Sequence, residues 1–292
     1  MNQLIGLIRT MRPKQWTKNG FIFIPLLFDG QVLVVESLLR TTAGFALLCL
    51  VSSTVYIVND LVDIEADREH PTKRYRALPS GQLSVPVAIA AAIILPVAAL
   101  PLAFLLTWEL AAVLAGYLAL QIAYSFYLKH VVLIDVMSIA AGFVLRVAAG
   151  ETVIEVTRFS PWLYVFTTML ALFLGFSKRR QELVLLEENA GKSRKSLEQY
   201  NLKLLDEMII IVIAMTVLTY TLYTFSAAGP GQNPMMLLTA PFVLYGIFRY
   251  LWLIHVQGET AAPDEVLLQD RPIQAALVLF FATVFVILYV LS

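Results

Sequence analysis

The chain has 292 residues, of which 59% are apolar and 14% charged, and its mean hydropathy is +0.76. A soluble globular domain carries about 45–50% apolar and about 25% charged residues. The composition therefore excludes an ordinary water-soluble enzyme, a disordered chain and a nucleic-acid-binding module. The 21 basic and 21 acidic residues cancel, so net charge predicts no partner. The single cysteine, Cys49, excludes an intrachain disulfide and a thiolate metal site.

The apolar residues lie in long blocks, which predict one polytopic, all-α membrane domain over residues 1–292. A helix that crosses a hydrocarbon core of about 30 Å needs about 20 mostly apolar residues. Nine segments meet this requirement, and the first is the weakest because Pro25, Asp29 and Gly30 interrupt it. The predicted spans are 18–36, 41–58, 85–107, 109–127, 132–150, 160–177, 206–227, 234–254 and 272–291.

The connecting segments differ in their content of Lys and Arg, which is higher in cytoplasmic loops. Seventeen such residues lie in the N-terminal segment, after spans two, four and six, or before span nine, whereas only Arg40 and Arg158 lie in the other loops. We therefore expect a plasma-membrane protein with a cytoplasmic N-terminus and, because the span number is odd, an external C-terminus. The N-terminal stretch lacks a signal-peptide cleavage pattern.

Two cytoplasmic segments are longer than a connection requires, namely 59–83 and 177–205. Both are charged. The second, which includes Lys192, Arg194 and Lys195, is expected to form a pair of amphipathic helices on the membrane surface.

A group of carboxylates follows the second span. If that helix continues, Asn59, Asp63 and Asp67 are spaced by four residues and share one face, with Asp60 beside them. Several carboxylates on one face repel each other at a membrane boundary unless a cation lies among them. Such oxygen ligands suit Mg²⁺, which typically takes one or two carboxylates, waters and substrate phosphates. The alternative is a solvated acidic helix end that pairs with the basic residues after it.

The loop that follows, residues 70–81, is cationic. Pro71 and Pro79 end the helix and stiffen the loop, and Lys73 and Arg76 supply charge that binds phosphate. The alternative is a loop whose positive charge only sets the orientation of the chain in the membrane. A carboxylate face with a metal ion, beside cationic side chains, is the arrangement expected for a substrate diphosphate.

The pattern Asn-Asp-x-x-Asp-x-x-x-Asp at residues 59–67 resembles the first aspartate-rich motif of the UbiA superfamily of membrane prenyltransferases. The resemblance implies a UbiA-type bundle of about nine transmembrane helices with two cytoplasmic substrate-binding loops. That family usually carries a second aspartate-rich helix end after span six. Here residues 175–183 are cationic instead, with Lys178, Arg179 and Arg180, so two facing metal clusters are not expected.

In this departure the chain resembles one branch of the superfamily, the decaprenyl-phosphate phosphoribosyltransferases. The resemblance also rests on segments 12–19, 65–74, 124–129 and 135–146. That resemblance implies an enzyme with Mg²⁺ as cofactor. It would transfer 5-phosphoribose from phosphoribosyl pyrophosphate to a polyprenyl phosphate in the membrane and release pyrophosphate. No nucleic acid is implied as a partner, and an oligomer is left open.

Two alternative functions remain open. One is a UbiA-type prenyltransferase that joins a prenyl diphosphate chain to an aromatic acceptor, which a second acidic motif would favour. The other is a transporter, which would place its site near the membrane midplane, whereas these charges crowd one membrane face.

The resemblance also implies roles for individual residues. Asn59 and Asp63 would ligate Mg²⁺, and the catalytic carboxylates would be Asp60, Asp63 and Asp67. The donor would be bound by Lys18, Lys73, Arg76 and Lys129. The acceptor phosphate would be contacted by Tyr56, Arg146, Lys178 and Arg179, and these groups would be supported by Lys14, Tyr124 and Asp135. Two alternatives remain open from the residues themselves: an ion pair between Asp135 and Lys129, and a structural pairing of Arg146 inside its apolar span.

Overall fold

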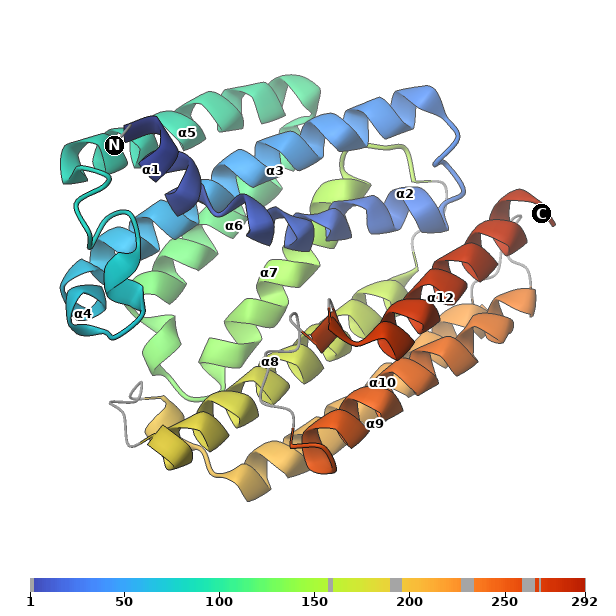
Figure 1. Ribbon diagram of the computed structural model, residues 1–292. Helices are drawn as coiled ribbons and strands as arrows, with labels where there is room; N and C mark the ends of the chain where they lie inside the picture. Colours follow the sequence, from blue (N-terminus) through green and yellow to red (C-terminus); the bar gives the residue numbers. More distant parts are fainter. Residues whose placement is uncertain are drawn as a thin grey trace. The chain divides into compact units, whose positions relative to one another are not determined.

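The computed structural model describes residues 3–156, 160–189, 196–226, 234–258, 266–267 and 269–291, and within these ranges all regular structure is helical. The chain divides into two compact units (Figure 1). Unit 1 comprises residues 1–27, 31–129 and 145–156, and unit 2 comprises residues 28–30, 130–144 and 157–292. Our expectation that residues 1–292 form a single domain stays a prediction.

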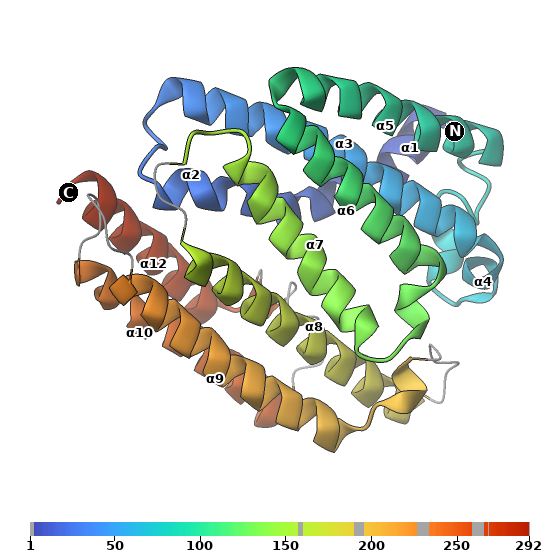
Figure 2. The ribbon, with the colours of Figure 1, turned by 180° about the vertical axis from the view of Figure 1, so that it is seen from behind.

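Unit 1 is built around the long helix α3. The segments α1, η1, α4, α5 and α6 contact α3, and both views of the ribbon show α5 and α6 beside it (Figures 1 and 2). In chain order the elements are α1 (Gln3–Met11), the 3₁₀ helix η1 (Pro13–Phe23), α2 (Ile24–Phe28), α3 (Val35–Val62), α4 (Ile64–Glu69), η2 (Lys73–Tyr75), α5 (Val85–Leu106), α6 (Trp108–Phe126) and η3 (Leu128–His130). Helix α7 (Ile134–Glu151) contributes its residues from 145 onward.

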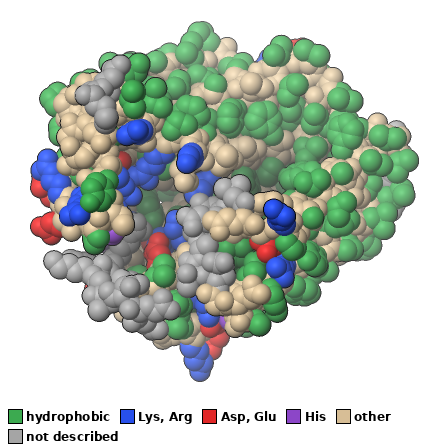
Figure 3. All heavy atoms as spheres, in the orientation of Figure 1, with side chains coloured by type: hydrophobic (Ala, Val, Ile, Leu, Met, Phe, Trp, Pro, Cys, Tyr) green, Lys and Arg blue, Asp and Glu red, His purple; other side chains and the backbone are tan. Residues whose placement is uncertain are grey.

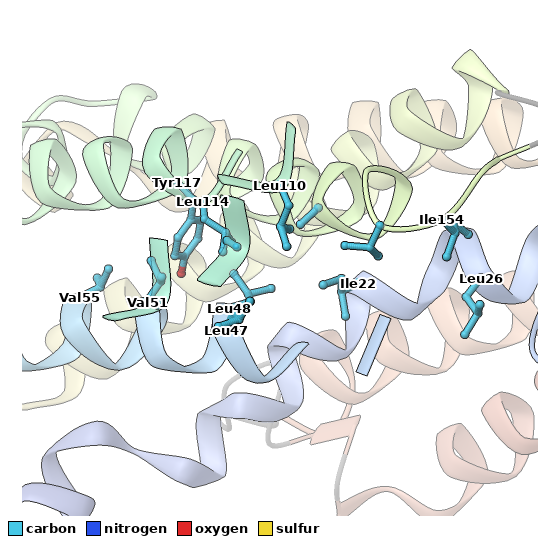
Figure 4. Close-up of a cluster of buried hydrophobic side chains, with 14 residues drawn as sticks. Ile22, Leu26, Leu47, Leu48, Val51, Val55, Leu110, Leu114, Tyr117 and Ile154 are labelled. Atoms are coloured by element: carbon cyan, nitrogen blue, oxygen red, sulfur yellow. The ribbon is translucent and has the colours of Figure 1, made fainter. Parts of the chain in front are cut away.

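The core of unit 1 is a cluster of buried apolar side chains from η1, α3, α6 and the end of α7 (Figure 4). Ile22, Val51 and Leu114 are almost completely buried in it. Helix α5 places Ala88 and Ala99 inward and exposes Ile94 and Leu105. Small inward residues let membrane helices approach closely, and the outward apolar side chains suit contact with lipid. Figure 3 shows how much of the visible surface is apolar.

Among its described residues, unit 2 contains the first part of α7 and four further long helices. These are α8 (Pro161–Asn189), α9 (Leu202–Ser226), α10 (Ala240–His255) and α12 (Arg271–Tyr289), with the 3₁₀ turns η4 (Leu197–Gln199) and η5 (Pro234–Thr239). Helix α8 packs along α9, and α10 along α12. Asp270 caps α12, because its carboxylate accepts a hydrogen bond from the Ile273 amide at 2.9 Å. The same carboxylate pairs with Arg249 at 3.0 Å.

Six of the described helices are long and apolar enough to cross a membrane, which confirms a multi-pass membrane protein. They are α3, α5, α6, α9, α10 together with η5, and α12. Helices α5, α6, α7 and α12 begin and end within two residues of the predicted spans. The total of nine spans stays a prediction.

Two expectations about local structure were wrong. The predicted first span, 18–36, is not one α-helix: η1 gives way to the five-residue α2, and the chain then turns at Gly30, whose φ is +74°. The predicted pair of amphipathic helices over 177–205 is also absent from the described part of that segment, because α8 runs without interruption to Asn189. Lys192, Arg194 and Lys195, like Arg158, lie outside the described residues.

A close approach between α7 and η1 generates a stability prediction. A Cβ atom at Gly150 would lie 2.0 Å from the Ile22 carbonyl oxygen, whereas one at Gly116 on α6 would meet nothing within 4 Å. We expect Gly150→Ala to destabilise the protein by about 1–3 kcal/mol through overpacking. Gly116→Ala should leave stability unchanged or slightly higher because alanine favours helix. Thermal unfolding in detergent measures both, and equal melting temperatures for the two variants would contradict the close approach.

Candidate active site

The carboxylate-rich segment lies at a junction between two helices. Helix α3 ends at Val62 and α4 begins at Ile64, with Asp63 between them at φ −93° and ψ 6°. The Asp63 amide still donates to the Asn59 carbonyl at 3.0 Å, and the Asp67 amide donates to the Asp63 carbonyl at 2.8 Å. The sequence predicted an uninterrupted helix. The structure instead breaks it at Asp63 while keeping the hydrogen bonds that span four residues.

Asp60 and Asp67 are buried, at 2% and 3% exposure, and both are held by arginines. Arg12 donates a hydrogen bond to Asp60. The Arg76 guanidinium lies 2.6 Å from Asp67 and 3.4 Å from Asp60, so it bridges the two carboxylates. Buried charges are tolerated when they are paired and hydrogen-bonded. This network ties the N-terminal segment, α3, α4 and the cationic loop together.

Asp63 has a different partner. Its carboxylate accepts a hydrogen bond from Lys129 Nζ at 2.9 Å, and the Lys129 side chain is 9% exposed while that of Asp63 is 32% exposed. The Lys129–Asp63 pair is the one observed, and the alternative of an ion pair between Lys129 and Asp135 stays a prediction. Lys129 follows α6 in the chain, so this contact brings the end of α6 to the end of α3.

The ligand atoms that the side chains offer decide whether a metal ion can bind. Among the described residues no group of three or more His, Cys, Asp or Glu side chains could hold one. Asn59 and Asp63, one helical turn apart, offer an amide oxygen and a carboxylate oxygen. Two such ligands fit Mg²⁺, which takes its remaining ligands from waters and substrate phosphates. Asp60 and Asp67, expected as catalytic carboxylates, pair with arginines, and their catalytic role stays a prediction.

The segment η1 runs along α3 away from this junction. Trp16 Nε1 donates to Ser53 Oγ at 3.1 Å, and Asn19 Nδ2 donates to Ser52 Oγ at 3.0 Å. Lys14 is exposed and Lys18 half-buried, and both lie in the stretch between Arg12 and Asn19. Of the other expected donor residues, Lys73 is half-buried at the start of η2. Figure 3 shows charged side chains together at the edge where α4 lies in Figure 1.

Three residues expected near the acceptor or in support of it also belong to unit 1. Arg146 is buried; its Nε donates to Asn19 Oδ1 at 3.0 Å and its Nη2 to the Tyr117 hydroxyl at 2.7 Å. This agrees with the alternative of a structural pairing. Tyr56 and Tyr124 are half-buried, and the Arg12 guanidinium lies 5.1 Å from the centre of the Tyr56 ring.

Asp135 and Arg179 form a buried ion pair within unit 2. Arg179 Nε lies 2.8 Å from the Asp135 carboxylate, the two side chains are 2% and 0% exposed, and Arg179 also pairs with Glu182. The Tyr200 hydroxyl donates to Asp135 at 2.9 Å and accepts from the Leu133 amide at 2.7 Å. Burial raises the pKa of Tyr200 to about 12, so it stays protonated and able to donate at neutral pH.

Arg179 is buried, and this distinguishes it from its neighbour Lys178. Lys178 is half-buried on α8 and remains a candidate for the acceptor phosphate. Arg179 instead joins α8 to the start of α7. Adjacent positions in a cationic run were expected to share a role, and the helix turns them to different surroundings.

Three residues that organise the site were not predicted from the sequence, namely Arg12, Asn19 and Tyr117. Arg12 adopts a left-handed backbone conformation, with φ 53°, immediately before Pro13. Arg12 and Asn19 are the first and last residues of the cationic segment 12–19, and the clustering of charge there was the sequence signal that could have pointed to them. Tyr117 gave none, since a tyrosine inside an apolar helix is ordinary.

Comparison with known proteins identifies the family and the fold of this chain. The chain matches the model of the UbiA prenyltransferase family over residues 26–268. It belongs to that family and is a membrane-embedded transferase, as its sequence predicted. A solved UbiA homologue from Archaeoglobus fulgidus, bound to DMAPP and Mg²⁺, superposes with a TM-score of 0.72 at 17% identity. The match covers 97% of this chain and 99% of that one, and confirms the UbiA-type fold.

Relatives of known name are more similar in sequence. The decaprenyl-phosphate phosphoribosyltransferase of Corynebacterium glutamicum is 36% identical over 292 residues, which cover 97% of this chain and 85% of the relative. The protein of the same name from Mycobacterium tuberculosis is 34% identical over 288 residues, covering 97% and 94%.

The bridging position of Arg76 yields a prediction about the cationic loop. Arg76→Met leaves Asp60 and Asp67 without a shared cation, so we expect a stability loss of up to about 3 kcal/mol. We also expect faster chymotrypsin cleavage at the exposed Tyr75, because the loop loses its attachment to α3 and α4. Arg68→Met is the matched control, since Arg68 pairs with the exposed Glu65 at 2.7 Å. Equal cleavage rates in the two variants would show that Arg76 does not secure the loop.

Proposed function

We propose that this protein transfers 5-phosphoribose from phosphoribosyl pyrophosphate to a polyprenyl phosphate of decaprenyl type, with release of pyrophosphate. Relatives that carry the name decaprenyl-phosphate phosphoribosyltransferase align over nearly the whole chain. The single observation in the structure that supports this reaction is the set of cations around one helix end: Arg12, Arg76 and Lys129 contact the carboxylates at residues 60–67.

Charge matching favours this donor over a prenyl diphosphate. Phosphoribosyl pyrophosphate carries a 5-phosphate in addition to its diphosphate, and each needs cationic partners. Lys129 lies beside Asp63 and Lys73 follows in the loop, while Lys14 and Lys18 belong to the segment that contacts α3 through Trp16 and Asn19. Lys and Arg bind phosphate without a metal ion.

One Mg²⁺ held by Asn59 and Asp63 would neutralise charge on the leaving pyrophosphate. The protein's own contribution is to place cations around the same group. Lys129 is already held at the Asp63 carboxylate, and Asp60 and Asp67 keep Arg12 and Arg76 in fixed positions. These two carboxylates therefore act through the arginines that they orient.

The acceptor makes small demands on the protein. A phosphate monoester has a second pKa of about 6, so it is already ionised at neutral pH and needs no strong general base. It does need a cation, and Lys178 on α8 is the candidate. Because Arg179 is committed to a buried ion pair, Lys178 alone is the informative position to substitute.

We also propose that the N-terminus and the site face the cytoplasm, where the soluble donor is found. The excess of Lys and Arg in the N-terminal segment and in loop 70–81 supports this orientation.

The substrate assignment predicts a clear difference between two assays. Purified protein given phosphoribosyl pyrophosphate, Mg²⁺ and a polyprenyl phosphate should release pyrophosphate and form a lipid-linked phosphoribose. Given a prenyl diphosphate and 4-hydroxybenzoate, it should form no product, because an aromatic acceptor leaves several cations without phosphate partners. Mass spectrometry of extracted lipids measures both products. A prenylated aromatic product without any phosphoribosyl lipid would establish the ordinary prenyltransferase instead.

The metal assignment predicts a second difference. Asn59→Ala and Asp63→Ala should lower turnover by about 100-fold or more while the protein still purifies, because transition-state stabilisation of the leaving group is lost. Glu65→Ala removes an exposed carboxylate from the same segment and should retain activity. A chelator should stop the wild-type enzyme. Full turnover in either ligand variant, or in excess chelator, contradicts the assignment.

A further inference from the structure

The 3₁₀ helix η1 is unusually long for its type. It extends over eleven residues, Pro13–Phe23, and it follows Arg12 in a left-handed conformation. Runs of 3₁₀ helix beyond three or four residues are uncommon, because their hydrogen-bond geometry is poor. Its conformation therefore depends on contacts from outside the segment. In the proposed reaction this segment matters, because it carries Lys14 and Lys18.

Helix α3 supplies one set of these contacts. Arg12 at the start is bonded to Asp60, and Trp16 to Ser53 at 3.1 Å. Asn19 contacts α3 through its amide nitrogen, which donates to Ser52 Oγ at 3.0 Å and to Cys49 Sγ at 3.3 Å.

Helix α7 supplies the other set. Arg146 Nε donates to the amide oxygen of the same Asn19, at 3.0 Å. One turn further along α7, Gly150 allows the helix to approach the backbone of Ile22. Asn19 is therefore held by its nitrogen from α3 and by its oxygen from α7, and the end of η1 is fixed between the two helices.

The Arg146 guanidinium is itself committed to this contact. It is 6% exposed, its Nη2 donates to the Tyr117 hydroxyl at 2.7 Å, and its centre lies 4.8 Å from the centre of the Tyr117 ring. A charged side chain inside a membrane helix carries a free-energy cost, and such residues are as a rule paired and functional. Here the fixed guanidinium is aimed at Asn19.

We propose that Arg146 is a positioning residue for the donor. Through Asn19 it holds η1 along α3, and with it Lys14 and Lys18, in the segment that begins after Arg12, the residue bonded to Asp60. This inference rests on the proposed function for the identity of the donor. It replaces the expectation that Arg146 contacts the acceptor phosphate.

A kinetic experiment tests the assignment to donor rather than acceptor. In Arg146→Met the KM for phosphoribosyl pyrophosphate should rise by about tenfold, the effect of losing one hydrogen bond to a charged group. The KM for the polyprenyl phosphate should stay within about twofold of the wild-type value. Arg146→Lys, which keeps the charge but not the planar donor geometry, should give the same pattern in weaker form.

Arg40→Met is the matched control. Arg40 also anchors elements of unit 1, since it donates to the Val153 carbonyl at 2.8 Å, but it does not contact η1 in the described structure. Its loss should lower thermal stability without raising the KM for the donor. A purely structural role for Arg146 would make the two variants alike.

A second measurement does not require the substrate. Cys49 is the only cysteine in the chain, is buried, and accepts the hydrogen bond from Asn19. Release of η1 should expose it, so labelling by N-ethylmaleimide should be several-fold faster in Arg146→Met and Arg146→Lys than in the wild type or Arg40→Met.

The outcomes separate the inference from the proposed function. A raised KM for the acceptor alone, or wild-type labelling together with a wild-type KM for the donor, overturns the role of Arg146. If wild-type protein forms no phosphoribosyl lipid, the proposed function fails. The labelling rates then still decide whether Arg146 holds η1.

Discussion

Two buried carboxylates at a membrane boundary impose the constraint on which unit 1 depends. Asp60 and Asp67 are removed from water, so each must lie against a positive charge. The chain provides these charges from two distant places, Arg12 before η1 and Arg76 in the cationic loop. Satisfying the carboxylates therefore brings these two parts of the chain to the end of α3. The position of the candidate site follows from this pairing.

The same logic divides the acidic motif into two kinds of residue. Asp60 and Asp67, seven residues apart, point toward Arg76, while Asp63 pairs with Lys129 from the end of α6. A lysine is a compact point charge, whereas an arginine binds through a planar fork and is well suited to permanent buried pairs. The half-exposed Asp63 with its lysine is accordingly the part of the motif best suited to exchange partners with a substrate.

Hydropathy predicted α5, α6, α7 and α12 closely, because a long apolar block admits one interpretation. It failed for residues 18–36, where a 3₁₀ helix precedes the short α2 and the chain turns at Gly30. It also failed for α8, whose charged final turns continue a helix that hydropathy ends. The motif at residues 59–67 was predictable because its spacing is local. The partners of Asp63, Asp135 and Arg146 were not, because each lies at least 29 positions away in the sequence.

The length of α3 determines how far the candidate site lies beyond the hydrocarbon core of the membrane. Its 28 residues, at about 1.5 Å each, make a helix about 42 Å long, whereas the hydrocarbon core measures about 30 Å. Even at a tilt of about 20° the helix projects beyond the core by several ångströms. The carboxylate junction at its end then lies at the level of the lipid headgroups. A water-soluble sugar phosphate can reach that level without entering the hydrocarbon core, and the phosphate of a lipid lies at the same level.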